Sequence, residues 1–372
     1  MPDHPLAPYG AVLLASFGGP EGPDEVMPFL RRATAGTGVP EARLAAVAEH
    51  YYVRGGISPL NAANEALRAA LTEELAHRGA SVPVLVGNRN APPEYADALD
   101  AAHQAGVRHV VALVTSAYAS YSGCRQYRED FAAQLEGRDL ALDKVRPFFN
   151  HPGFVAANVD ALADACAELF EGEADGSVDR VVFVTHSLPV PMAQASGACG
   201  PDYTAQHLDV AELVARAAGE RLGRTLTWDL AYCSRSGPPR QPWLEPDVND
   251  HLAALAGAGV RRVVLAPVGF VCDHMEVVND LDDEAVATAR AHGMTVVRAA
   301  TAGTHPAFVA GLVDLLLERA AAARAQAAGT AAPDPVRVGT LPARPDRCPV
   351  GCCFREAGVD SGLPAACTDE TG

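Results

Sequence analysis

The sequence predicts an α/β protein with two Rossmann-like domains, each containing a parallel sheet of about four strands flanked by helices. Three observations support this fold class. Short apolar, β-branched runs alternate with longer segments of helical periodicity, which is typical of parallel sheets covered on both faces. This alternation occurs once in each half of the chain. With 372 residues, the chain is long enough for two domains that each have a core.

The first half contains four predicted strands. The run at 10–17 ends in Gly18-Gly19-Pro20, a sharp turn that lets backbone approach a ligand. Ser58-Pro59 opens a long helix, because proline is favoured in the first helical turn. The predicted strands are 10–17, 82–88, 107–114 and 143–149, and the predicted helices include 41–52, 60–78 and 95–105.

The second half repeats the arrangement, beginning with a helix at 154–170. Its predicted strands are 180–185, 226–232, 261–266 and 295–299. A segment rich in Pro, Ala and Gly follows the last long helix and is typical of a linker. We therefore predict a domain at 8–153, completed by a C-terminal helix at 306–328, a second domain at 154–305, and a linker with a cysteine-rich, cluster-binding tail at 329–372.

A short internal similarity is consistent with two related halves. Residues 105–113 (AGVRHVVAL) resemble residues 258–266 (AGVRRVVLA), and each copy passes from a glycine helix end into a strand. Two such units facing each other would leave a cleft between the carboxyl ends of their strands, where these folds bind ligands. Duplication and convergence of two similar strand openings both explain the similarity.

Charge and composition narrow the classes of partner. The formal net charge of −17 argues against nucleic acid and anionic membranes. No run approaches the ~20 apolar residues of a membrane span, and no secretory signal is visible at the N-terminus, so we expect a cytoplasmic protein. Nine cysteines then indicate metal or redox chemistry rather than a disulfide scaffold. Lys144 is the only lysine.

Three carboxylates follow the predicted strand at 261–266. Glu276, Asp280 and Glu284 are spaced four residues apart, so a helix would place them on one face. Like charges at this spacing weaken an isolated helix. The row is therefore either a solvated face or a path for cations, and its spacing alone favours the solvated face.

His186 and Glu276 are the candidate catalytic residues. Each follows a predicted strand of the second half, so both can reach one cleft. A histidine with a carboxylate suits Fe(II) and related divalent cations, and a histidine can also act as a base. His274 leaves the chain at a different angle from Glu276, and we expect it to support the site rather than bind metal.

Several residues of the first half could bind an anionic ligand. Arg31, Arg32 and Arg54 can bind carboxylates through their guanidinium forks, although they could equally pair with the many acidic residues of the chain. Hydroxyl donors are available from Ser58, Tyr121 and Tyr127, and Phe17 offers a flat apolar surface.

Four cysteines cluster in the last 25 residues: Cys348, Cys352, Cys353 and Cys367. Three of them could supply thiolates, and Cys166 is a candidate for the fourth. Four thiolates suit a [2Fe–2S] cluster or a structural zinc ion. The spacing of Cys348, Cys352 and Cys353 does not choose between them.

Six motifs, in their order along the chain, resemble those of ferrochelatases over essentially the full length, most closely the actinobacterial coproporphyrin ferrochelatases. They are LASFGGP (14–20), GGISPL (55–60), YSGCRQY (121–127), THSLP (185–189), YCSRSGP (232–238) and PVGFVCDHME (267–276).

The resemblance implies a chelatase-like fold and insertion of Fe(II) into a porphyrin, with coproporphyrin III as the expected substrate in heme biosynthesis. His186 and Glu276 match the iron-contacting pair, and Ser58 and Tyr127 match positions that contact propionates. Phe17 matches the position facing the macrocycle, which excludes an axial phenolate. A basic run that relatives carry after the first helix reads Ala35-Gly36-Thr37 here, which leaves Arg31, Arg32 and Arg54 as the candidate clamp.

The resemblance also implies a [2Fe–2S] cluster held by Cys166 and three tail cysteines, taken as Cys348, Cys352 and Cys353, with Cys367 as a substitute. Asp280 and Glu284 are the candidate relay for iron or protons behind Glu276. We expect a monomer, with transient contacts to neighbouring heme-pathway enzymes. Three alternative functions remain open: a protoporphyrin IX ferrochelatase, a cobalt or nickel chelatase acting on another tetrapyrrole, and a two-lobed tetrapyrrole carrier.

Overall fold

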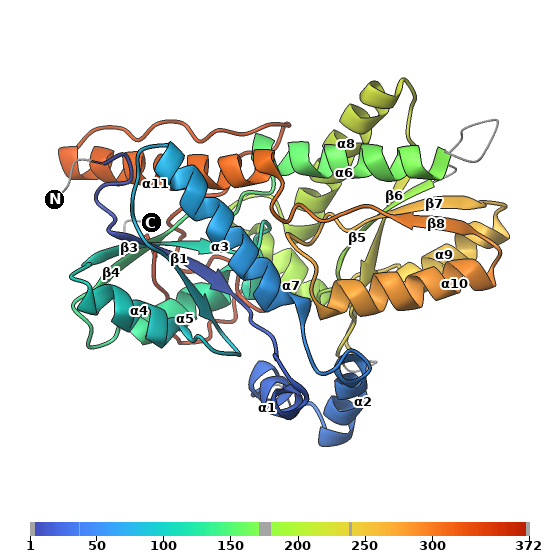
Figure 1. Ribbon diagram of the computed structural model, residues 1–372, viewed down its shortest axis with the longest axis horizontal. Helices are drawn as coiled ribbons and strands as arrows, with labels where there is room; N and C mark the ends of the chain where they lie inside the picture. Colours follow the sequence, from blue (N-terminus) through green and yellow to red (C-terminus); the bar gives the residue numbers. More distant parts are fainter. Residues whose placement is uncertain (1–3, 37, 171–179, 238–239, 370–372) are drawn as a thin grey trace.

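Two four-stranded parallel sheets form the centre of the molecule (Figure 1). The computed structural model describes residues 4–36, 38–170, 180–237 and 240–369. The first sheet has the order β2-β1-β3-β4 and the second β6-β5-β7-β8, which confirms the predicted fold class. The strands are β1 (Ala11–Ser16), β2 (Val84–Asn88), β3 (His109–Val114), β4 (Ala141–Lys144), β5 (Arg180–His186), β6 (Trp228–Cys233), β7 (Arg262–Ala266) and β8 (Thr295–Arg298).

Helices cover both faces of each sheet, because successive residues of a strand point to opposite faces. On β1, Val12 and Leu14 pack into one core, and Leu13 packs into another beneath α4 and α5. On β5, Phe183 faces α6 and α8, whereas Val184 faces α9 and α10. These helices are α3 (Pro59–His77), α4 (Tyr95–Gln104), α5 (Gln126–Leu135), α6 (Pro152–Phe170), α8 (Tyr203–Leu222), α9 (Val248–Gly257), α10 (Val286–Ala291) and α11 (Pro306–Ala328).

The fourth strand ends earlier than predicted. The sequence suggested a strand at 143–149, but β4 stops at Lys144. Pro147 lacks a backbone donor for a ladder, and the amides of Phe148 and Phe149 both bond to the carbonyl of Ala117, each at 2.9 Å. The apolar residues after β4 are buried, but they pack as a loop.

Helices α1 (Pro23–Ala33) and α2 (Glu41–Tyr52) stand apart from the sheets and form a lip (Figure 1). Their inner faces make a small apolar cluster with Phe29, Leu44 and Tyr51, and Met275 of the second half packs against it. The lip therefore touches both halves of the chain.

The C-terminal segment is packed against the body. Helix α11 contacts α3 of the first half and α6 of the second, and one continuous core cluster includes residues of both halves. The predicted linker beyond α11 bonds to the body, with the amide of Val338 on the carbonyl of Asn150 at 2.9 Å. Arg344 in the same segment is buried. No helix in the described ranges is long and apolar enough to cross a membrane.

Candidate functional site

An open cleft of about 330 Å³ lies between the two halves, within the size range of small-molecule sites. Ser16 and Phe17 at the end of β1 and Thr115 after β3 line it from the first half. His186 at the end of β5 and Gly269 after β7 line it from the second half. The carboxyl ends of both sheets therefore meet at one cleft, where parallel sheets bind ligands.

Gly269 permits the close approach that forms the second-half wall. A Cβ at this position would lie 2.1 Å from Oγ1 of Thr185. Thr185 is itself fixed, since its hydroxyl bonds to Tyr203 and to His207, each at 2.8 Å. A side chain at position 269 would therefore displace the strand end that carries His186.

His186 and Glu276 face each other in the cleft. The distance from Nε2 of His186 to Oε1 of Glu276 is 3.4 Å, and the side chains are 29% and 49% exposed. Burial opposes charge on His186, but the carboxylate of Glu276 outweighs it and raises the pKa of His186 to about 9. Nδ1 of His186 lies against the carbonyl of Ser187, which also favours the protonated form.

The same pairing stabilises the negative charge of Glu276. Burial opposes ionisation of this carboxyl, but the neighbouring His186 outweighs it and lowers the pKa of Glu276 to about 2. His274 lies beside the pair, and its Nδ1 accepts a bond from the amide of Glu276 at 3.2 Å. With no ligand bound, the site holds an imidazolium and a carboxylate at neutral pH.

Asp280 and Glu284 lie on a π-helix, η3 (Val277–Ala285), and not on the α-helix that their spacing predicted, and Glu276 directly precedes this π-helix. Asn279 joins the row by donating to Asp280 at 3.1 Å and to Glu284 at 3.0 Å. Asp280 also accepts a bond from Ser234, and burial raises the pKa of its carboxyl. Glu276 in the cleft and Glu284 at the far end of the row are both exposed, and a relay along the row stays a prediction.

Aromatic rings form an apolar part of the cleft in the first half. Phe17 is 40% exposed and packs edge-on against Phe29 at 6.0 Å between ring centroids. Tyr51 lies next to Phe29 at 5.9 Å, and all three rings line the cleft. These rings offer a surface for a flat apolar ligand.

Hydroxyl groups form the polar wall of the cleft. Ser58 caps α3, since its Oγ accepts a bond from the amide of Leu60 at 3.3 Å. Tyr127 lies on α5 beneath the guanidinium of Arg89, which is 4.1 Å from its ring centroid. The hydroxyl residues of this wall are Ser16, Ser58, Thr115, Ser116, Ser120, Ser122 and Tyr127.

The three candidate arginines do not line the cleft, and no arginine does so among the described residues. Arg31 pairs with Glu41 on the surface, and Arg32 donates to the carbonyl of Asn90 at 2.8 Å. Arg54 pairs with Asp283 of the second half and donates to the carbonyl of His50 at 3.2 Å. Their part in binding an anion stays a prediction, and each would first have to leave its present partner.

A second group, the sulfur group, contains Cys124, Cys199, Cys348, Cys352 and Cys353. Donor atoms of Cys199, Cys348 and Cys352 lie within 4.8 Å of one another, and Cys199 and Cys352 are joined as a disulfide. The sulfurs of Cys352 and Cys353 are 3.6 Å apart. The thiols of Cys348 and Cys353 donate to Cys124 and hold its pKa well below the usual range.

The structure does not bring Cys166, the predicted fourth ligand, to the sulfur group; Cys124 lies there instead. Cys166 faces the core beneath α6, and burial raises the pKa of its thiol to about 11. Cys367 also lies apart, with its sulfur 3.6 Å from the carbonyl of Leu142. Cys166 points from α6 into the core, whereas the tail cysteines lie against Cys124 and Cys199.

Two buried cations adjoin the sulfur group. Arg344 is 2% exposed and donates to the sulfurs of Cys199 at 3.0 Å, Cys353 at 3.4 Å and Cys352 at 3.5 Å. Lys144 is also buried, which lowers its pKa, but the negative charge of Cys124 outweighs burial and keeps the pKa of Lys144 raised. Buried cations require nearby anions, so the presence of Arg344 and Lys144 fits cysteines of the sulfur group that are thiolates.

Several of these residues were missed in the sequence. Cys124 had a usable signal, because it lies in the motif YSGCRQY (121–127) that also carries Tyr127. Lys144 had one too, as the single lysine of an arginine-rich chain. Cys199 and Arg344 lie in segments with no distinguishing pattern, and only the packing of the tail reveals their position.

The fold and the cleft together define a class of protein: a two-halved α/β protein whose parallel sheets meet at a cleft with a His–Glu pair and an aromatic wall. The family model described as Ferrochelatase matches residues 9–320. The chain is 50% identical over 358 residues to a coproporphyrin III ferrochelatase from Streptomyces coelicolor, covering 93% of this chain and 94% of the relative. It is 51% identical over 330 residues to one from Leifsonia xyli, with 84% of each chain covered.

The chain therefore belongs to the ferrochelatase family. Among solved structures, SirB from Bacillus subtilis with Fe3+ has 14% sequence identity and a TM-score of 0.49, covering 85% of this chain and 97% of that chain. That similarity is too low to add to the argument.

Proposed function

We propose that this chain inserts Fe(II) into coproporphyrin III to give Fe-coproporphyrin in heme biosynthesis. The observation that carries the proposal is the His186–Glu276 pair, set in a cleft lined by aromatic rings and hydroxyls. The relatives, about 50% identical, that are named coproporphyrin III ferrochelatases support the choice of substrate. Binding of the macrocycle against Phe17 would leave its carboxylates to the hydroxyl wall.

Metallation of a porphyrin requires the loss of two N–H protons and the entry of a divalent ion. Metal ligation requires a neutral imidazole, and a neutral imidazole is also needed to accept a proton. Because Glu276 keeps His186 protonated before substrates bind, we propose that His186 first releases its proton. Glu276, Asp280 and Glu284 offer carboxylates along a route to solvent. His186 then takes the two pyrrole protons one after the other, passing the first to solvent along these carboxylates before it accepts the second. It also helps to position iron, with Glu276 as the second iron contact.

Hydroxyl and backbone donors are suited to the substrate's propionates. Ser58 and Tyr127 stand on two different helices of the first half, and both line the cleft. Donors fixed in this way bind carboxylates without adding positive charge. Arg31, Arg32 and Arg54 could also bind the propionates if they first release the groups to which they are now bonded.

The decisive experiment is steady-state Fe(II) insertion into coproporphyrin III by the wild type and by the His186→Ala and Glu276→Gln variants. We expect each substitution to lower kcat/KM by about 100-fold or more, the size expected for loss of a general base or charge partner. Glu65→Gln, on the outer surface of α3, is the control and should behave as the wild type. A variant that keeps the full rate would remove that residue from the mechanism.

The same assay separates the alternative functions. Protoporphyrin IX is offered in place of coproporphyrin III, and Co(II) and Ni(II) in place of Fe(II). Preference for another macrocycle or metal would replace the proposed substrate. If the protein is a carrier, the wild type and His186→Ala should bind porphyrin equally well. Neither should then insert metal faster than buffer alone does.

We also propose a [2Fe–2S] cluster in the sulfur group, held by Cys124, Cys348, Cys352 and Cys353. The donor set fits, because these sulfurs converge in a buried place beside Arg344 and Lys144. Cys352 becomes available when its disulfide with Cys199 is reduced. A bound cluster would link the tail to the first half and can exchange one electron.

Visible absorption of anaerobically purified protein tests the cluster and its ligands. We expect Cys124→Ser to abolish the absorption, because the fourth ligand is lost, whereas Cys166→Ser and Cys199→Ser keep it. Measured iron and acid-labile sulfide should follow the colour. A colourless wild-type protein that contains zinc would contradict the cluster, and loss of colour in Cys166→Ser would restore the original ligand set.

Three further expectations stay predictions: a cytoplasmic location, a monomeric state, and transient contacts with neighbouring heme-pathway enzymes. Size-exclusion chromatography with light scattering tests the monomer directly.

A further inference from the structure

The short π-helix η1 (Tyr121–Arg125) and the start of α5 separate the cleft from the C-terminal tail. Ser120, Ser122, Gly123 and Tyr127 of this segment line the cleft. The neighbouring Cys124 lies against Cys348 and Cys353 of the tail. One segment therefore forms the cleft wall with one side and binds the tail with the other.

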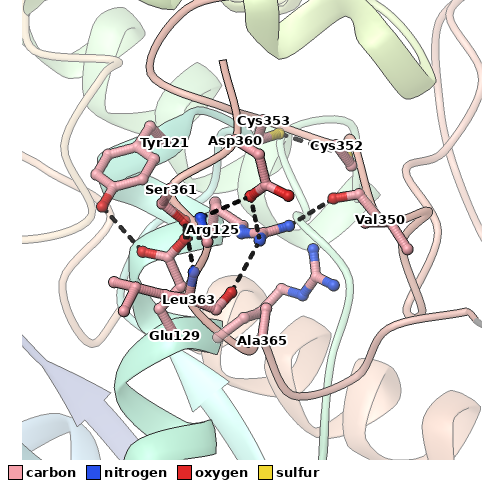
Figure 2. Close-up of polar contacts among 12 residues, drawn as sticks. Tyr121, Arg125, Glu129, Val350, Cys352, Cys353, Asp360, Ser361, Leu363 and Ala365 are labelled. Carbon is pink, nitrogen blue, oxygen red and sulfur yellow. Dashed lines mark hydrogen bonds and ion pairs between the residues drawn. The ribbon is translucent and has the colours of Figure 1, made fainter. Parts of the chain in front are cut away.

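Arg125 joins the tail to this segment. Its side chain is 3% exposed, and Figure 2 shows it surrounded by tail residues. It donates to the carbonyl of Val350 at 2.6 Å and to the carbonyl of Leu363 at 3.4 Å. A single guanidinium thus holds two separate parts of the tail.

Glu129 fixes Arg125 from α5. Its carboxylate accepts bonds from Nε of Arg125 at 2.9 Å, from the hydroxyl of Tyr121 at 2.9 Å and from the hydroxyl of Ser361 at 2.8 Å. These bonds connect η1, α5 and the tail at one buried point. Removing only one partner of such a pair would leave a buried charge without compensation.

The cleft side of η1 has little freedom to move independently. The amide of Gly123 donates to Oγ of Ser120 at 2.9 Å, and the amide of Cys124 donates to the carbonyl of Ser120 at 3.0 Å. A Cβ on Gly123 would lie 2.6 Å from Oγ of Ser116. A shift of η1 toward or away from the tail would therefore move the hydroxyl wall.

We propose that Arg125 is a positioning residue for the porphyrin site: by tying the tail to η1, it fixes Ser120, Ser122 and Gly123 where the substrate's carboxylates bind. The inference rests on the proposed function for the identity of the substrate. Arg125 does not contact the His186–Glu276 pair, so it acts on binding and leaves the insertion step unchanged.

The test compares Arg125→Met/Glu129→Leu with the wild type. Replacing both partners removes the hydrogen bonds from Arg125 to the tail without leaving a buried charge. We expect KM for coproporphyrin III, and Kd from a porphyrin absorption titration, to rise about tenfold, as for loss of one charge-assisted hydrogen bond to substrate. We expect kcat to stay within about twofold. Arg125→Lys, which can still donate to Glu129, should give an intermediate KM.

Arg347→Met is the matched control. Arg347 also ties the tail to the body, through Asp143 at 3.2 Å, and its bond to the carbonyl of Thr368 at 3.0 Å stays within the tail. Neither bond involves a residue of η1, so the KM and Kd of this variant should equal those of the wild type. Circular dichroism and thermal unfolding show which variants are folded. A folded double variant with wild-type Kd, or one that loses kcat at unchanged KM, would overturn the inference. Absence of insertion by the wild type would refute the proposed function instead, and the titration would still test Arg125.

Discussion

The ionised pair of His186 and Glu276 gives a prediction at the residue scale. We expect NMR titration of the ligand-free wild type to show a pKa of about 9 for His186. In Glu276→Gln the negative partner is lost, so the pKa should fall toward the ordinary value of about 6.5. At pH 7.5, His186 should thus be protonated in the wild type and mostly neutral in the variant.

Glu284→Gln is the control for this titration. Glu284 lies at the exposed end of the acidic row, bonded to Asn279 at 3.0 Å, and its substitution should leave the pKa of His186 near 9. A wild-type value near 6.5 would show that Glu276 does not govern the proton.

At the residue scale, the sequence predicts the position of a side chain when the strand that it follows determines that position. His186 and Glu276 could be identified because each follows a strand of the same sheet. The position of Cys124 beside the tail cysteines could not be predicted, because Cys166 and Cys124 both lie in suitable sequence surroundings and differ only in what their helices face. The partners of Arg31, Arg32 and Arg54 likewise depend on how the lip sits on the body.

The close approach of β5 and the segment after β7 gives a prediction at the scale of elements. Gly269→Ala places a Cβ against Thr185, so we expect a loss of about 1–3 kcal/mol in the free energy of unfolding, typical of overpacking. Fe(II) insertion should also slow, because His186 follows Thr185. Denaturant unfolding and the steady-state assay measure the two effects.

Gly257→Ala is the matched control. Gly257 ends α9, and nothing lies within 4 Å of the Cβ that alanine would add. We expect it to be neutral or slightly stabilising, since alanine is favoured over glycine in a helix. Equal effects of the two substitutions would mean that the contact with Thr185 is not tight.

Strand periodicity predicts elements well where both faces of a sheet are buried. All eight predicted strands overlap strands of the structure. The prediction at 143–149 runs furthest past the end of the observed strand, because β4 stops at Lys144. The carboxylate row shows the limit, because a four-residue spacing suits both an α-helix and the wider turn of a π-helix. Only the backbone bonding of 277–285 distinguishes them.

At the scale of the whole molecule, the net charge of −17 acts in opposite ways on the two proposed substrates. It repels an anionic porphyrin and attracts Fe(II). Raising the ionic strength from about 0.01 to about 0.15 M shortens the Debye length from about 30 to about 8 Å. We expect porphyrin association, measured by stopped-flow absorption, to speed up by about threefold or more, whereas KM for Fe(II) rises.

Sucrose at matched osmolality is the control and should change neither quantity. Slower porphyrin association at high salt would mean that a local cationic patch, and not the net charge, governs the approach. In that case the arginines of the lip become the first residues to examine.

The dependence of the first half on α11 has a consequence for synthesis of the chain. The first sheet has all four strands once Lys144 has been made, but Leu312, Leu315 and Leu316 of α11 complete the core that it shares with the second half. The ribosome must add 172 further residues, from position 145 to Leu316, before this core can be complete. At about 5–20 residues per second this takes roughly 10–30 s. During that time the nascent first half exposes an apolar face. The tail with its cysteines emerges later still, so the hydroxyl wall gains its support only after both sheets have formed.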